Sequence, residues 1–98
     1  MIALSLEAEE QVDRLIAHYE GKERPSAAVN LLDALERAKQ RIGRSPEAGL
    51  EAPRPYPALK RYGRRWLLEA RYWISDSLTT PPVISGVFYV TSDIPNRI

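Results

Sequence analysis

Apolar positions recur with a helical period over two long segments near the start of the chain. From the N-cap residue Ser5 to Gly21, one helical stripe is formed by Ala8, Val12, Leu15, Ile16 and Tyr19. From Pro25 to Gly43, a second stripe is formed by Ala28, Leu31, Leu32, Leu35, Ala38 and Ile42. The short connection between these segments predicts two amphipathic helices that pack as an antiparallel hairpin.

The pattern changes from helix to strand in the second half of the chain. Ile2 and Leu4 already alternate with smaller residues at the start, which indicates one short strand there. Apolar runs from Arg65 to Ile74 and over residues 83–90 predict three more strands. Within the last run, Gly86 indicates a bulge or a close backbone contact.

Turn and loop signals separate these strands. Asp76 and Ser77 are predicted to open a turn that runs to Pro81–Pro82. Residues 46–64 contain four prolines and two glycines, which predict an irregular loop. The order is therefore β-α-α-β-β-β. It predicts one α+β domain over residues 1–98, with the helical hairpin on one face of a small, mainly antiparallel sheet.

Composition excludes several kinds of site. The 98 residues include no cysteine and one histidine, His18, so disulfides and thiolate metal sites are excluded, and no cofactor is expected. No apolar run approaches the roughly 20 residues that span a bilayer, and the N-terminus lacks the pattern of a signal peptide. We therefore expect a cytoplasmic protein without a membrane partner.

Charge is distributed unevenly although the net charge is only +1. Residues 1–23 hold six acidic and two basic side chains, whereas residues 54–71 hold six basic side chains and one acid, Glu69. This asymmetry predicts a basic surface that meets an anionic partner. The alternative is a solvated, arginine-rich loop.

Several segments, in their order along the chain, resemble the ParE/RelE family of toxins. The resemblance lies in Ser5-Leu6-Glu7-Ala8 with Val12 and Leu15, Ser45-Pro46-Glu47-Ala48-Gly49, Arg65 with Arg71-Tyr72-Trp73-Ile74, and Val87-Phe88-Tyr89 with Asp93-Ile94-Pro95. The family implies the toxin of a type II toxin–antitoxin system, which inhibits growth until its antitoxin binds it. Its ParE branch is associated with poisoning of DNA gyrase, and its RelE branch cleaves mRNA on the ribosome.

The resemblance to the RelE branch implies catalytic cations and a tyrosine or histidine on the sheet. Arg65, Arg71 and Tyr89 are the candidates if the chain is a ribonuclease. A full set of acid and base groups is missing from the sequence, and His18 is expected on the first helix, away from the sheet. Structural roles for all three candidates stay open, because Tyr89 can be a packed aromatic and both arginines can link strands. We therefore expect a non-enzymatic, ParE-like toxin with no catalytic residues.

The partners implied by the resemblance are a ParD-like antitoxin, in a toxin–antitoxin hetero-oligomer, and DNA gyrase as target. The predicted contact residues are Lys60, Arg61, Arg64, Arg65 and Trp73. Trp66 is expected in the core, and Trp73 either in the core or at an interface. The exposed side of the hairpin is a second candidate surface, and direct sequence-specific binding of nucleic acid is not expected. A ribosome-dependent mRNA endoribonuclease and a non-toxic, antitoxin-binding family member remain the alternatives.

Overall fold

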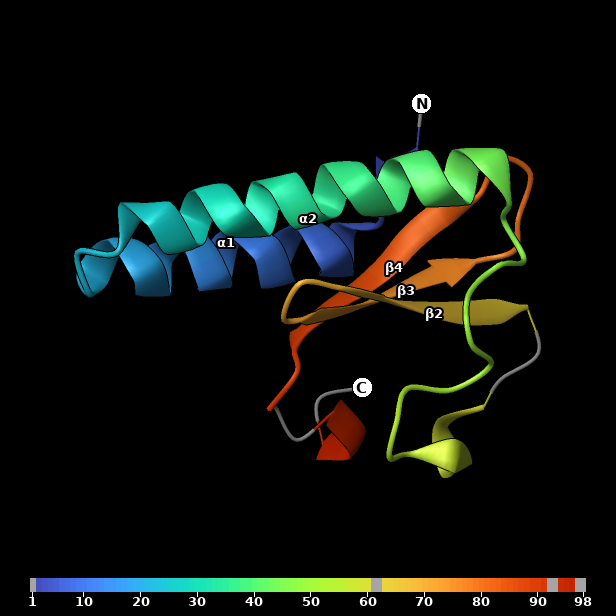
Figure 1. Cartoon of the computed structure of the whole chain (residues 1–98). Coiled ribbons are helices and arrows are strands. Elements are labelled where there is room, and N and C mark those ends of the chain that lie inside the picture. The colour runs from blue at the N-terminus through green and yellow to red at the C-terminus, as the bar shows by residue number, and fades with distance from the viewer. Residues whose placement is uncertain (1, 61–62, 92–93, 97–98) are drawn as a thin grey trace.

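The computed structural model describes residues 2–60, 63–91 and 94–96 and confirms the β-α-α-β-β-β order of an α+β fold. Figure 1 shows two long helices over one side of a sheet. The elements are β1 Ala3–Leu4, α1 Leu6–Gly21, α2 Pro25–Arg44, β2 Arg64–Glu69, β3 Tyr72–Ser77 and β4 Val83–Tyr89. Two short 3-10 turns, Pro57–Leu59 and Ile94–Asn96, lie on the other side of the sheet (Figure 1).

Local signals place the ends of the helices. The backbone N–H of Ala8 donates a hydrogen bond of 3.1 Å to Ser5 Oγ, so Ser5 caps α1 as predicted. Pro25 is the first residue of α2, where its missing N–H costs no helical hydrogen bond. At the other end, α2 continues one residue past Gly43 to Arg44.

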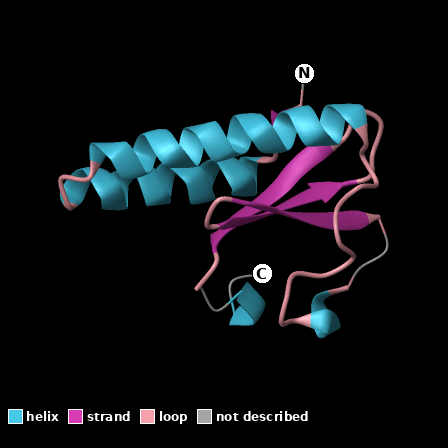
Figure 2. Cartoon of the chain, in the orientation of Figure 1, coloured by secondary structure: helices cyan, strands magenta, loops and turns pink. Residues whose placement is uncertain are grey.

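The four strands have the order β1-β4-β3-β2 (Figure 2). β1 runs parallel to β4, whereas β3 pairs antiparallel with both β4 and β2. These two strands can run parallel because they are not consecutive: α1, α2, β2 and β3 lie between them in the chain. β3 and β4 are therefore the two central strands.

Alternation along the strands divides the core into two parts. The larger part fills the space between the hairpin and the sheet, and its buried members are Ala8, Val12, Tyr19, Leu31, Ala34, Leu35, Ala38, Ile42, Leu67, Tyr72, Ile74, Ile84 and Val87. On the opposite face, Trp66, Trp73, Phe88 and Ile94 form a smaller buried cluster. Tyr56 and Leu59, from the proline-rich loop, pack against this smaller cluster. The loop and the C-terminal turn thus cover the face of the sheet that the helices leave free.

The prediction that Asp76 and Ser77 open a turn is wrong, because both residues belong to β3. Asp76 lies opposite Arg65 of β2 and Ile84 of β4, and Ser77 is paired on both sides as well. Pairing with two neighbouring strands therefore outweighs the local preference of Asp and Ser for turns.

A bulge in β4 confirms the prediction made from Gly86. Ser75 lies opposite Gly86, and Asp76 lies opposite Ile84, which leaves Ser85 as the extra residue. A Cβ atom at Gly86 would come within 2.7 Å of the Phe88 ring and 2.8 Å of Ser75 Oγ. Glycine is needed here because the bulge presses the backbone against these side chains.

Candidate functional site

The basic segment predicted to contact partners lies at the start of β2 and in the loop before it. Lys60 Nζ lies 2.9 Å from a carboxylate oxygen of Glu51, and this hydrogen bond and charge lower the pKa of Glu51. Arg64 and Arg65 are half-buried, and Arg61 lies outside the described residues. Because successive strand residues face opposite sides, Arg65 faces the helices and Arg64 faces away from them. The two arginines therefore belong to different surfaces.

Asp76 is the acidic residue beside Arg65. It is fully buried, and neither carboxylate oxygen has a hydrogen-bond partner among the described residues. Burial raises the pKa of Asp76 to about 6, although the positive charge of Arg65 acts in the opposite direction. Arg65 Nη1 donates to the backbone oxygen of Arg64 over 3.1 Å. The nearby cation therefore offsets only part of the cost of burying this carboxylate.

Arg65 does not share a site with Arg71 and Tyr89. Arg65 lies opposite Asp76, whereas Tyr89 lies opposite Tyr72 at the other end of β3. At about 3.3 Å per residue, roughly 13 Å of strand separates these two places. Arg71 Nη1, in contrast, lies 3.4 Å from Tyr89 Oη. The fold thus brings together two of the three candidate ribonuclease residues and leaves the third apart.

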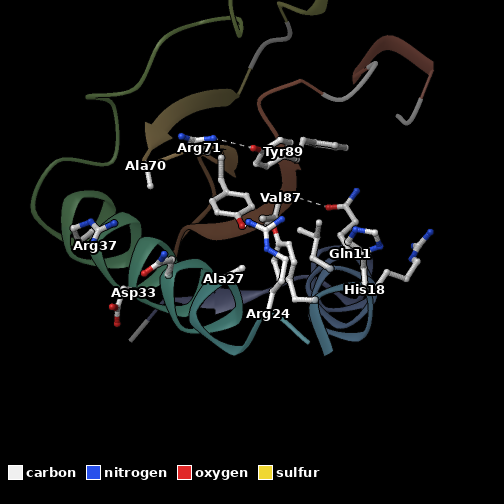
Figure 3. A pocket seen from close by; sticks show the side chains of 16 residues that line it. Gln11, His18, Arg24, Ala27, Asp33, Arg37, Ala70, Arg71, Val87 and Tyr89 are labelled. Atoms are coloured by element: carbon white, nitrogen blue, oxygen red, sulfur yellow. Dashed lines mark hydrogen bonds between the residues drawn. The ribbon is translucent and has the colours of Figure 1, made fainter. Parts of the chain in front are cut away.

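Arg71 and Tyr89 line an open groove beneath the free end of the helical hairpin (Figure 3). The hairpin extends beyond the end of the sheet in Figure 1, and the groove has a volume of about 1110 Å³. Its lining carries four guanidinium groups, which belong to Arg14, Arg24, Arg37 and Arg71. These arginines come from α1, from the connection between the helices, from α2 and from the β2–β3 turn.

Two hydrogen-bonded tyrosines form part of the groove lining. The hydroxyl groups of Tyr19 and Tyr72 are bonded to each other, and both residues are largely buried. Burial, and then the hydrogen bond with Tyr19, raise the pKa of Tyr72, so its hydroxyl stays protonated at neutral pH. The rings of Tyr72 and Tyr89 meet edge to face, with centroids 5.7 Å apart. These aromatic contacts hold Tyr89 beside Arg71.

The arginines of the groove differ in their pairing. Arg37 Nε lies 3.2 Å from Glu69 Oε2, and Arg14 Nη2 lies 3.9 Å from Glu10 Oε2 in an exposed pair that stabilises little. Within the part of the chain that the structure describes, Arg24 and Arg71 form no ion pair. The four arginines share the lining with one carboxylate, that of Asp33. The groove therefore carries an excess of positive charge.

Trp73, which the sequence assigns to either the core or an interface, is 3% exposed and packs in the smaller core cluster. Trp66 is fully buried in the same cluster, as predicted. In this conformation the two tryptophans hold the proline-rich loop and the C-terminal turn against the sheet. Neither side chain lies on the surface, so Lys60, Arg64 and Arg65 are the described contact candidates that remain accessible.

Sequence reasoning missed the groove and three of its arginines. His18, expected away from the sheet, also lines it, on the same side of α1 as Arg14. The spacing of Arg14 and His18 by four residues was a signal that both lie on one helical face. Nothing in the sequence indicated that this face meets the β2–β3 turn.

Comparison with known proteins assigns no family to this chain, since it matches no protein-family model and no curated protein. Among the described residues there is no cluster of three or more His, Cys, Asp or Glu that could hold a metal ion. In the same residues no helix is both long and apolar enough to cross a membrane. The fold and the arrangement of charged residues are therefore the features that bear on function.

Proposed function

We propose that this chain is the toxin of a type II toxin–antitoxin system, of the ParE-like branch, and that it inhibits DNA gyrase until a cognate antitoxin binds it. The observation that carries the proposal is the topology. The β-α-α-β-β-β order, with the hairpin on one face of the sheet, is the fold that the resemblance to ParE/RelE toxins implies. The residues of the resemblance are spread along this topology, from α1 to β4.

The separation of Arg65 from Arg71 and Tyr89 supports a toxin that acts by binding. A ribonuclease of the RelE kind needs its cations and its proton-transfer groups around one phosphate. About 13 Å of strand lies between the two ends of β3 where these residues are found. The face of the sheet opposite the helices carries the buried side chains of Trp66, Trp73 and Phe88 beneath the loop.

A ribosome-dependent mRNA endoribonuclease is the alternative, and the contact between Arg71 and Tyr89 favours it. These two residues share the groove with His18, so a cation and two groups able to transfer protons face the same space (Figure 3). The third reading is a family member that binds its antitoxin without being toxic.

The accessible end of β2 and the outer side of α2 are the proposed antitoxin surfaces. Val29 and Leu32 are 55% and 48% exposed and lie three residues apart on α2. An amphipathic segment that folds on binding can cover such a pair. Lys60, Arg64 and Arg65 supply positive charge for an acidic part of the antitoxin. The resulting complex is a toxin–antitoxin hetero-oligomer.

Controlled expression in bacteria tests this proposal. Growth arrest that is relieved by the product of the adjacent gene is the expected result. The double variant Lys60→Glu, Arg64→Glu is expected to weaken both the arrest and antitoxin binding by about tenfold or more, because it replaces two attractive charges by repulsive ones. Lys22→Glu, at the free end of the hairpin, is the matched control. Unchanged arrest and unchanged affinity in the double variant would remove the basic end of β2 from the proposal.

A further inference from the structure

The groove beneath the hairpin holds two backbone features that the proposed function does not use. Among the described residues, two that are not glycine have a positive φ, namely Glu23 at +54° and Ala70 at +52°. Each one directly precedes an arginine of the groove, Arg24 or Arg71. The left-handed conformation costs a residue with a Cβ of order 1–2 kcal/mol, so it persists only where the surroundings enforce it. Each of the two turns thus contains a strained residue directly before an arginine of the groove.

The same two arginines are those of the groove without an ionic partner among the described residues. Arg71 touches the Tyr89 hydroxyl at 3.4 Å, and this contact raises the pKa of Arg71. The charge of Arg24 lies close enough to Tyr72 to act on its hydroxyl. Figure 3 shows Arg24 and Arg71 on the lining of one groove, with Arg71 beside Tyr89. Two guanidinium groups without an ionic partner among the described residues therefore line the same groove, and Arg71 donates one hydrogen bond to Tyr89.

The tyrosine hydroxyl groups of the lining provide further hydrogen-bond donors beside these arginines. In the Tyr19–Tyr72 pair one hydroxyl donates to the other, so one hydroxyl hydrogen remains for a third group. An arginine presents donors in a planar fork, and a phosphate accepts hydrogen bonds from several directions around a tetrahedron. The lining places donors on a helix connection, a strand turn and a tyrosine pair, and a tetrahedral group can accept from such different directions better than a planar carboxylate can.

Charge and volume indicate more than one phosphate. Four arginines and one aspartate line the groove, and two of the arginines, Arg24 and Arg71, have no ionic partner among the described residues. Its volume of about 1110 Å³ is slightly above the range of small-molecule sites, about 300–1,000 Å³. A single orthophosphate would leave most of this space unused. Linked phosphates place several negative charges in a short length, so they can reach arginines on different sides of the groove.

We propose that the groove between the hairpin and the β2–β3 turn binds an oligophosphate, that is, two or more phosphate groups linked in a row. Arg24 and Arg71 bind neighbouring phosphates, Arg14 and Arg37 supply charge from the two helices, and the tyrosine hydroxyls donate from the floor. A nucleoside triphosphate and inorganic polyphosphate both carry this group. The site does not depend on whether the chain inhibits gyrase.

Calorimetric titration of the full chain with tripolyphosphate and with ATP, at low salt and without divalent cations, tests the proposal. Saturable binding at one site is expected for both probes, with loss of affinity as salt rises. Arg24→Gln and Arg71→Gln should each weaken binding by about tenfold, since each removes one charged hydrogen-bonding group. Arg44→Gln, which removes an exposed arginine at the opposite end of α2, should change affinity less than twofold. Circular dichroism confirms that each variant is folded.

The two probes also distinguish the sources of the phosphate. Tighter binding of ATP than of tripolyphosphate identifies a nucleotide site, and equal binding identifies a site for inorganic polyphosphate. The proposal is overturned if neither probe saturates, or if Arg44→Gln weakens binding as much as Arg24→Gln does. It is also overturned if a glutamate-rich peptide binds at this groove while both phosphate probes fail.

Discussion

Replacing Asp76 by asparagine is expected to stabilise the chain at neutral pH. Asp76 is fully buried in β3, and its carboxylate oxygens have no hydrogen-bond partner among the described residues. Arg65 lowers the cost of this charge without forming a hydrogen bond to it. An amide in the same place keeps the shape of the side chain and removes the buried charge.

The size of the effect follows from the pKa of Asp76. Burial raises this pKa from an ordinary value of 3.8 to about 6, so the folded state binds a proton at a higher pH than the unfolded state does. Stability is therefore highest below pH 3.8 and is lost as the pH rises from about 4 to 6. The difference of about 2.2 pH units corresponds to at most about 3 kcal/mol. Asp76→Asn should recover about 2–3 kcal/mol at pH 7.5 and about 1 kcal/mol at pH 4.5.

Urea unfolding followed by tryptophan fluorescence measures this difference, because Trp66 and Trp73 are both buried and report on the core. For a chain of this size, with m of about 1.5 kcal/mol per M, a gain of 3 kcal/mol raises the urea midpoint by about 2 M. Asp13→Asn, on the exposed side of α1, is the matched control and should leave the midpoint unchanged at both pH values.

An equal midpoint difference at pH 4.5 and pH 7.5 would refute the reasoning, because the effect would then not come from titration of Asp76. A loss of stability in Asp76→Asn at pH 7.5 would contradict it more strongly. Such a loss would mean that the ionised carboxylate is stabilised in the folded chain.

Two further predictions concern the backbone. Gly86→Ala should destabilise the chain by about 1–3 kcal/mol, because its Cβ would come within 2.7 Å of the Phe88 ring. Gly43→Ala, in an open part of α2, should instead stabilise the chain by about 0.5–1 kcal/mol. Urea midpoints of the two variants that move in the same direction would count against this pair of predictions. Ala70→Gly should stabilise the chain by about 1 kcal/mol, because it relieves a φ of +52° in the β2–β3 turn, and a lower thermal midpoint than the wild type would show that the turn is not strained.

The order of the elements was predictable because each helix and strand has its own period. The stripe from Ala28 to Ile42 repeats at helical spacing over about four turns. Residues 83–90 are rich in β-branched and aromatic side chains. The end of β3 was not predictable in this way. Asp76 and Ser77 favour turns locally, and only the pairing of β3 with strands on both sides keeps them extended.

The candidate site was predictable only in part, because it depends on distances between elements. The contact of Arg71 with Tyr89 follows from the pairing of β3 with β4. Arg65 does not join these two residues, because the pairing of β2 with β3 places it near the other end of β3. Arg24 looks like an ordinary linker residue in the sequence. Its role in the groove appears only when the hairpin is placed over the end of the sheet.

A DNA supercoiling assay with purified gyrase and this protein tests the central claim most directly. Inhibition of supercoiling with accumulation of cleaved DNA, relieved by the antitoxin, is the result that we predict. Full gyrase activity at protein concentrations that still arrest growth would contradict the claim. Cleavage of mRNA on ribosomes, with Arg71 and Tyr89 as the first residues to substitute, would then be the next activity to measure.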